Sequence, residues 1–253
     1  MSDLKNLLLW PGKSAQTAAG CEHPAIYHML DVAAVAEQLI EPFAIPSALR
    51  DALILLIALH DLGKINQSFR AMLQGDKAAP SFRHWEVSEV LLRHHDHLLA
   101  DHLGGDRLPR EALYAAISGH HGRPPTLRFP VAQAKRVRLV QADDALRFAG
   151  YGVAASAEVI AAFAALWPKA RLEGLDLATA QTLSWWLAGL CTTADWLGSN
   201  TDWFEPTDEQ VPLDIYLESR RKKASRAIAE AGLAEAPAKP GNLFAYGNAP
   251  GVG

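Results

Sequence analysis

Apolar residues recur every three or four positions along much of this chain, which is the spacing of helices that bury one face. Five segments show the pattern: the stretch opened by Pro24, Ala48 to His60, His84 to His95, the stretch from Pro109 to His121, and Ala178 to Leu197. Ser47 is placed to cap the second segment, and Gly122 is placed to end the fourth. Because the fifth segment is long and strongly apolar, we expect it to lie centrally in the fold.

The polar positions divide the chain into two regions. Up to about residue 205 we find no segment that alternates apolar and polar residues as a half-buried strand does, so residues 1–205 are predicted to form one all-α domain. Residues 206–253 differ in character. They contain a polar, amphipathic helix candidate that ends near Gly232, followed by sequence rich in Pro, Ala and Gly that is typical of a linker.

The composition is that of a soluble globular protein, with 49% hydrophobic and 21% charged residues. The sequence lacks a run of about 18 uncharged apolar residues, so no membrane association is expected. Its first residues lack the features of a secretory signal. Cys21 and Cys191 are too few for a disulfide framework and fit a reducing cytoplasm, which is the expected location.

The formal net charge is -4, so overall charge does not favour binding to polyanions. Two basic clusters, Lys135–Arg138 and Arg220–Arg226, are interpreted as solvated helix faces, which is the commoner meaning of such clusters. Contact with a nucleic acid would therefore depend on local patches or on bound cations.

Polar residues at the ends of the apolar segments are the candidates for metal binding and catalysis. His60 and Asp61 end the apolar run ALILLIALH, where burying either group without a partner is costly. A His-Asp cap of the helix end would explain this pair equally well. If the helix stops there and the chain turns through Leu62 and Gly63, however, both side chains can converge on a cation.

Further polar residues have similar settings: His28, His84, His120, His121 and Asp195. Each alone is weak evidence, because core histidines are often satisfied within the protein. Their occurrence at the ends or inner faces of five predicted helices indicates a shared centre. In contrast, His94, His95, His97 and His102 are interpreted as a solvated helix end, and His23 is expected to lie outside the centre. Trp85 and Trp196, beside two of the centre residues, are more readily read as core residues than as a surface for bases.

The ordered motifs YHMLDVAAVAE, ALHDLGK, RHWEVSEVLL, SGHHG and TADWLGSN resemble the HD superfamily of metal-dependent phosphohydrolases. More closely, they resemble the HD nuclease domain of the CRISPR-associated nuclease-helicase of type I interference systems. The resemblance covers about residues 8 to 205. HD alone is a weak signal, but SGHHG together with DWLGSN is specific. The resemblance implies an HD-type helical bundle with a dinuclear metal centre between its helices.

Residue roles follow from the same resemblance. One metal would be held by His28, His60, Asp61 and Asp195, and a second by Asp61, His84, His120 and His121, with Asp61 bridging. Lys64 would contact the scissile phosphate, and Ser199 is a second candidate for a phosphate contact. Asp61 and Lys64 are thus the expected catalytic residues.

The implied activity is metal-dependent cleavage of single-stranded DNA in antiviral interference. Two cations about 3.5–4 Å apart can activate a nucleophile and neutralise the charge that develops on a phosphodiester. A site rich in histidine favours Mn²⁺, Fe²⁺, Co²⁺ or Ni²⁺ over Mg²⁺, which prefers oxygen ligands. The implied partners are a guide-RNA surveillance complex and a helicase, either a separate subunit or a domain reached through the region 206–253.

Two other functions remain open at this stage. The chain could be an HD phosphohydrolase of nucleotides or cyclic dinucleotides, although the His120–His121 pair and DWLGSN argue against it. It could also be a non-catalytic module that docks on a surveillance complex. Binding of a transition metal would distinguish the enzymes from the docking module.

Overall fold

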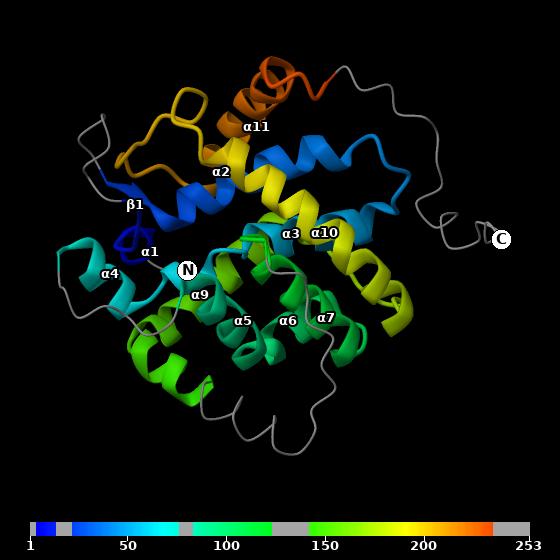
Figure 1. The fold of residues 1–253 in the computed structure, drawn as a ribbon, viewed down its shortest axis with the longest axis horizontal. Coiled ribbons are helices and arrows are strands. Elements are labelled where there is room, and N and C mark those ends of the chain that lie inside the picture. The colour runs from blue at the N-terminus through cyan, green and yellow to red at the C-terminus, as the bar shows by residue number, and fades with distance from the viewer. Residues whose placement is uncertain (1–3, 14–21, 76–82, 123–141, 235–253) are drawn as a thin grey trace.

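The computed structural model describes residues 4–13, 22–75, 83–122 and 142–234. Helices dominate these residues, so the predicted all-α fold is confirmed (Figure 1). In chain order the elements are α1 (Leu4–Leu7), β1 (Pro11–Lys13), β2 (His23–Pro24), α2 (Ala25–Ile40), α3 (Ser47–Ala58), the 3-10 helix η1 (Leu62–Lys64), α4 (Gln67–Leu73), α5 (His84–His94), α6 (Asp96–Leu103), α7 (Arg107–Ser118), a helix at Ala142–Ala149, α9 (Gly152–Leu166), α10 (Leu177–Gly198) and α11 (Leu213–Glu230).

Helix α2 lies at the centre of the fold. It buries every residue except Glu37, Gln38 and Leu39, and the buried residues include the polar His28 and Asp31. Helices α3, α10 and α11 pack against it, and α10 also packs along α7 (Figure 1). The predicted helix at 178–197 therefore bridges two parts of the bundle, with one face directed outward.

The polar region after residue 205 contains the expected helix, α11, which ends just before Gly232. The helix lies against α2 through stacked rings of Tyr27 and Tyr216, whose centroids are 3.9 Å apart. The Tyr216 hydroxyl donates a hydrogen bond to buried Asp31 at 3.0 Å, and Arg220 lies 3.2 Å from the same carboxylate. The division at residue 205 stays a prediction, and the structure adds that α11 packs on the helix that carries His28.

Local structure differs from the sequence-based picture at three places. β1 and β2 form a short antiparallel pair, which is too brief to show alternation in the sequence. Ser47 is the first residue of α3 and makes no capping hydrogen bond, because Pro46 occupies the capping position. Helix α7 begins at Arg107, two residues before Pro109. These differences change helix ends by a few residues and leave the predicted helices in place.

The segment of clustered histidines is also different from the prediction. It is not one solvated helix end, because α5 stops at His94 and a new helix, α6, starts at Asp96. His94 and His97 are exposed, as expected, but His95 is buried between the helices. Its Nε2 atom lies 3.0 Å from the carbonyl oxygen of Val153 on α9, a partner that is remote in sequence.

The basic cluster on α11 is only partly a solvated face, because Lys222 and Arg226 are exposed as expected but two arginines are not. Arg220 is buried beside Asp31, and Arg221 pairs with Glu37 on α2 and with Glu218. Since these cations have acidic partners, they offer little charge to a polyanion. The cluster at 135–138 lies outside the described residues.

No single helix in the described ranges is long and apolar enough to cross a membrane. The two helices at 142–149 and 152–166, bent by 87° at their junction, meet the length and composition criteria only as a pair.

Candidate metal centre

The histidine and aspartate residues singled out in the sequence come together where several helices end. Helix α3 stops at Ala58, and the chain turns through His60 and Asp61 into η1, so both side chains point inward. His84 is the first residue of α5, and His120 and His121 directly follow α7. His28 and Asp195 project from the interior of α2 and from the last turns of α10. All seven candidate residues therefore share one centre.

The first group of candidate ligands consists of His28, His60, Asp61 and Asp195. One ligand atom from each lies within 4.8 Å of those of the others. His28 Nε2 lies 3.2 Å from Asp61 Oδ2 and 3.3 Å from Asp195 Oδ1. His60 Nε2 approaches the same two oxygens at 3.4 and 3.7 Å. Two imidazole nitrogens and two carboxylate oxygens thus surround one point.

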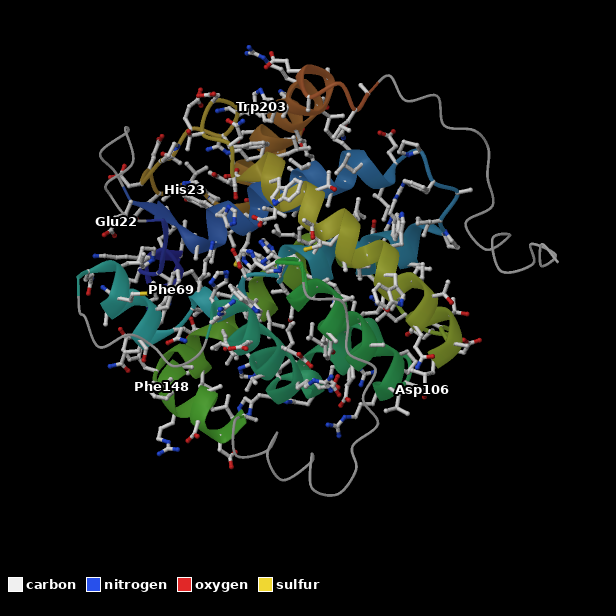
Figure 2. The ribbon with its side chains drawn as sticks, viewed as in Figure 1. Glu22, His23, Phe69, Asp106, Phe148 and Trp203 are labelled. Carbon is white, nitrogen blue, oxygen red and sulfur yellow. The ribbon has the colours of Figure 1, made fainter. Side chains whose placement is uncertain are left out.

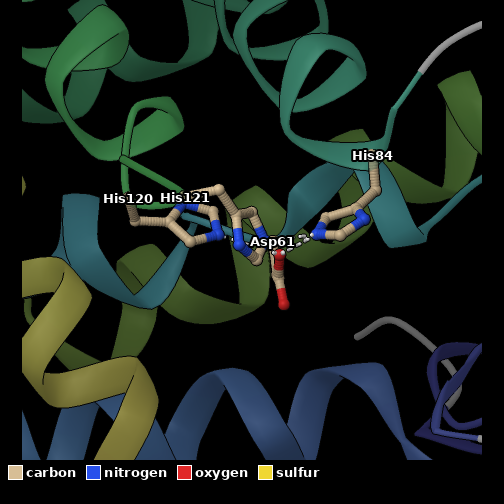
Figure 3. Close-up of side chains that lie close together, drawn as sticks. All are labelled: Asp61, His84, His120 and His121. Carbon is tan, nitrogen blue, oxygen red and sulfur yellow. Dashed lines mark hydrogen bonds and ion pairs between the residues drawn. The ribbon is translucent and has the colours of Figure 1, made fainter. Parts of the chain in front are cut away.

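The second group consists of Asp61, His84, His120 and His121, again within 4.8 Å of one another (Figure 3). Asp61 Oδ1 lies 3.3 Å from His84 Nε2 and 3.6 Å from His120 Nε2. His84 Nε2 and His121 Nε2 face each other at 3.0 Å. Asp61 belongs to both groups, directing Oδ2 to the first and Oδ1 to the second, as the expected bridging role requires.

Backbone carbonyls orient two of the rings. His60 Nδ1 donates to the carbonyl oxygen of Ile57 at 2.9 Å, and His120 Nδ1 donates to that of Ile117 at 2.7 Å. In both cases the acceptor lies three residues earlier, in the last turn of the preceding helix. A proton held on Nδ1 leaves Nε2 as the lone-pair nitrogen that can bind a metal.

Buried polar atoms without hydrogen bonds gather at this point. Among the described residues, His28 Nε2, His60 Nε2, His120 Nε2 and Asp61 Oδ1 are buried and have no hydrogen-bond partner. Leaving such atoms unsatisfied costs about 1–3 kcal/mol each, so a native structure rarely tolerates several together. All four are potential metal ligands, two from the first group and two directed to the second, so the residues fit a pair of bound cations.

The charges in the centre are strongly coupled. Burial disfavours the imidazolium of His60, but the negative charges of Asp61 and Asp195 outweigh burial and raise the pKa of His60 to about 9. Burial, reinforced by the charge on His60, lowers the pKa of His120 to about 3. Burial alone would raise the pKa of Asp61, yet Lys64 and His60 hold it well below its usual value. The two carboxylates therefore favour the protonated form of His60.

The two expected phosphate contacts lie at the edge of this centre. Lys64, in η1, directs Nζ to Asp61 Oδ2 at 2.6 Å and is 9% exposed. Ser199 Oγ donates to Asp195 Oδ1 at 3.1 Å, so this hydroxyl orients a candidate ligand. Contact of either side chain with a phosphate stays a prediction.

The centre opens toward His84 and His121. His28, His60, Asp61 and His120 are at most 2% exposed, whereas the side chain of His84 is 18% exposed and His121 is exposed. On this side Phe69 of α4, labelled in Figure 2, packs edge-on against His84 with ring centroids 5.7 Å apart. A substrate would therefore reach the second group more easily than the first.

The two tryptophans beside the centre differ from each other. Trp85 is half-buried and packs on the ring of His121 at 4.5 Å, with the guanidinium of Arg83 over its ring at 5.0 Å. Trp196 is 74% exposed, so its interpretation as a core residue is wrong. Helix α10 buries its inner face against α2 and α7 and leaves Trp196 exposed.

Several supporting groups escaped the sequence analysis. Ser88 Oγ accepts a hydrogen bond from the backbone N–H of Gly63 at 2.8 Å and thereby fixes η1 to α5. Thr192 Oγ1 donates to the carbonyl oxygen of His120 at 2.7 Å and fixes the segment after α7 to α10. Neither Ser nor Thr is distinctive in a helix, so only the assembled fold reveals these contacts. His23 pairs with Asp31 at 3.0 Å and belongs to neither ligand group.

Comparison with solved structures supports the fold. The HD domain of cas3 from Thermus thermophilus, determined in the presence of Ni²⁺, is 23% identical to this chain, with a TM-score of 0.63 over 91% of this chain and 92% of that one. T. fusca Cas3 is 18% identical, with a TM-score of 0.65 over 90% of this chain and 27% of that one. A chain of a CRISPR RNA-guided surveillance complex in a pre-nicking state is 19% identical, with a TM-score of 0.65 over 90% of this chain and 29% of that one.

The chain thus spans between a quarter and a third of the length of the two larger neighbours. No curated protein sequence matches it. The sequence family described as the HD domain of Cas3 matches residues 10–204, which include all seven residues of the centre. This match covers most of the chain, and the chain therefore belongs to the Cas3 HD-domain family.

Proposed function

We propose that this chain is a metal-dependent nuclease that hydrolyses phosphodiester bonds of single-stranded DNA in type I CRISPR interference. The observation that carries the proposal is the pair of four-residue ligand groups that share Asp61. A single cation site would need only one of these groups. Two groups with a common carboxylate are the arrangement with which proteins hold two cations against one phosphate.

Each residue has a distinct role in this proposal. Asp61 bridges the two sites, and the remaining six residues complete them: His28, His60 and Asp195 on one side, and His84, His120 and His121 on the other. Bound metals would supply Lewis acidity toward the phosphate and toward the attacking water. Lys64, which is paired with Asp61, would contact the phosphate at the edge of the centre. Ser199 holds Asp195 and contacts the phosphate from the same side.

The donor atoms favour transition metals. Five of the seven candidate ligands are histidines, and imidazole suits Mn²⁺, Fe²⁺, Co²⁺ and Ni²⁺ better than Mg²⁺. The structure of the Thermus thermophilus neighbour was determined with Ni²⁺, which supports the same choice. Bound cations also offset the overall charge of -4, so the centre attracts a phosphate although the chain as a whole is acidic.

Single-stranded DNA is the preferred substrate for a geometric reason. The scissile phosphate must reach ligand atoms that are almost completely buried, and a flexible single strand can bend into such a site more readily than a stiff duplex. The proposed partners are a helicase and a guide-RNA surveillance complex, which together would expose and deliver the strand. The likeness to a chain of a surveillance complex supports this assignment.

The deciding experiment compares circular single-stranded DNA with intact duplex DNA at equal concentration, with Mn²⁺ and without nucleotide. We expect the circle to be cleaved, the duplex to remain largely intact, and a chelator to stop the reaction. Equal cleavage of the duplex, or a strict requirement for ATP, would contradict the proposal. Hydrolysis of nucleotides or cyclic dinucleotides with no action on DNA would instead show that the chain is an HD phosphohydrolase of such nucleotides.

A further inference from the structure

Most tryptophans of this protein have a partner inside the fold. Five of the seven contact a ring, a cation or a carboxylate: Trp10 with Tyr151, Trp85 with His121 and Arg83, Trp167 with Glu37, Trp186 with Phe43, and Trp203 with Glu230. Trp185 and Trp196 have no such partner in the described part of the chain. They are 56% and 74% exposed. Two large, unpartnered indoles at the surface need an explanation.

Both indoles lie on the same side of α10. They are separated by eleven residues, which is close to three turns, so they share one helix face about 16 Å apart. Between them lie Gly189, where an added Cβ would meet nothing within 4 Å, and Thr193, whose hydroxyl is turned to the carbonyl oxygen of Gly189 at 3.0 Å. We call Trp185, Gly189, Thr193 and Trp196 the outer row of α10, the helix labelled in Figure 1.

The outer row ends at the residue that follows a candidate ligand. Trp196 directly follows Asp195, a member of the first ligand group, so a base on this indole would lie within a few nucleotides of a phosphate in the centre. Trp85 occupies the matching position after His84, but its ring is already packed against His121 and Arg83. Trp85 therefore positions His121, and Trp196 is the indole with a face available to a base.

The charge on α10 also suits a nucleic acid. Asp195 is the only charged residue between Leu177 and Gly198, although the whole chain carries 28 acidic residues. Helix α10 itself would thus present no carboxylate outside the centre to a strand along the outer row. Aliphatic residues, which a protein helix would need for close packing, are missing from the outer row itself.

We propose that the outer row of α10 is a stacking surface for bases of single-stranded DNA, with Trp196 nearest the centre and Trp185 farther along the strand. The inference rests on the proposed function, because it takes the phosphodiester substrate of the same centre as given. At about 3.4 Å per stacked nucleotide, the distance between the indoles corresponds to about five nucleotides. Stacking on π-faces is tolerant of sequence, so the surface guides the strand without selecting a base.

The test measures binding of a labelled thymidine 12-mer to the full chain by fluorescence anisotropy, with chelator present so that cleavage does not interfere. Trp196→Ala and Trp185→Ala should each weaken binding about 5- to 100-fold, and Trp196→Phe should recover most of the loss. Leu108→Ala and Ile215→Ala remove apolar side chains that are 57% and 58% exposed on other helices, and they should bind like the wild type. An abasic 12-mer should bind weakly and equally to all five variants.

The outcomes separate this inference from the proposed function. If both alanine variants bind the thymidine 12-mer as the wild type does, the stacking surface is excluded, whatever the metal does. If Trp185→Ala leaves DNA affinity unchanged but abolishes self-association in sedimentation, the row is a protein-docking face and the inference is again wrong. Failure of the wild type to be stabilised by Mn²⁺ or to cleave DNA contradicts the proposed function instead, while the dependence of binding on the tryptophans is still measured.

Discussion

Gly63, in the segment that follows Asp61, allows a close approach of two backbones beside the metal centre. A Cβ atom added at this position would lie 1.9 Å from the carbonyl oxygen of His84 and 2.6 Å from the backbone nitrogen of Ser88. Both are main-chain atoms of the first turns of α5, so no side-chain rotation can relieve the overlap. The backbone of η1 must separate from α5 before alanine can fit.

The cost of Gly63→Ala follows from two contributions. Overpacking against a rigid neighbour typically costs about 1–3 kcal/mol. Separation of the two elements also lengthens the hydrogen bond from Gly63 N–H to Ser88 Oγ, which is worth about 1 kcal/mol. We therefore expect the free energy of unfolding to fall by about 2–4 kcal/mol. In addition, α5 carries His84 at its first position, so the second ligand group loses its geometry and its affinity for Mn²⁺ falls.

The measurement is urea unfolding of the metal-free protein, followed by calorimetric titration with Mn²⁺. Gly189→Ala is a control with the same substitution, because this glycine lies on the exposed face of α10, where an added Cβ meets nothing within 4 Å. Alanine there should be neutral or stabilising by up to about 1 kcal/mol, since alanine favours a helix more than glycine does. A Gly63→Ala protein within about 0.5 kcal/mol of the wild type, with unchanged Mn²⁺ affinity, would refute this reasoning.

Three further predictions test other parts of the structure. Asp61→Ala removes the shared carboxylate and should lower the cleavage rate more than about 100-fold, with little change in helical circular dichroism. His94→Ala changes an exposed residue outside the centre, so its cleavage rate should stay within a few-fold of the wild-type rate. Comparable losses of rate in the two variants would contradict the ligand assignment. The rise in melting temperature on adding Mn²⁺ should shrink in His28→Ala, His84→Ala and Asp195→Ala, and a full rise in all three would remove them from the centre. Burial is the main cause that lowers the pKa of His95 to about 4. Between pH 4 and about 6.5 the unfolded chain therefore binds more protons at this residue than the folded chain does. The free energy of unfolding should fall as the pH falls through that window, by at most about 3 kcal/mol. The readout is the slope of stability against pH, which should be smaller in His95→Gln than in the wild type, and equal slopes would exclude the role of His95.

The helices and the candidate ligands were accessible from the sequence because both leave local signals. An apolar stripe marks a helix, and His60, Asp61 and His120 stand out since they interrupt or end such stripes. The sequence therefore predicts all seven candidate ligands, and the structure places them close together. Their assignment to two groups came from the family resemblance, because helical spacing does not reveal which helix ends face each other.

Burial and pairing that depend on residues far away in the sequence could not be predicted from the sequence. Asp31 is buried at 1% exposure, and its partners His23, Tyr216 and Arg220 lie up to 189 positions away along the chain. The burial of His95 depends in the same way on α9, and the exposure of Trp196 depends on which face of α10 other helices cover. Amphipathic periodicity locates an apolar face, but it does not show whether that face is met by another helix or by solvent.

Two glycines close to candidate ligands explain how such precise convergence is possible. Gly63 lies two residues after Asp61, and Gly198 lies three residues after Asp195, where an added Cβ would come within 2.9 Å of the backbone nitrogen of Val32 on α2. Each glycine brings the backbone of a ligand-bearing segment against a helix that supplies another ligand: His84 on α5 in one case and His28 on α2 in the other. Ligand atoms must be held to within about 0.5 Å for metal binding, and contact between backbones gives that precision better than contact between flexible side chains. The glycines therefore help to position the ligands, and substitution of a glycine or of a ligand should lower the affinity for metal.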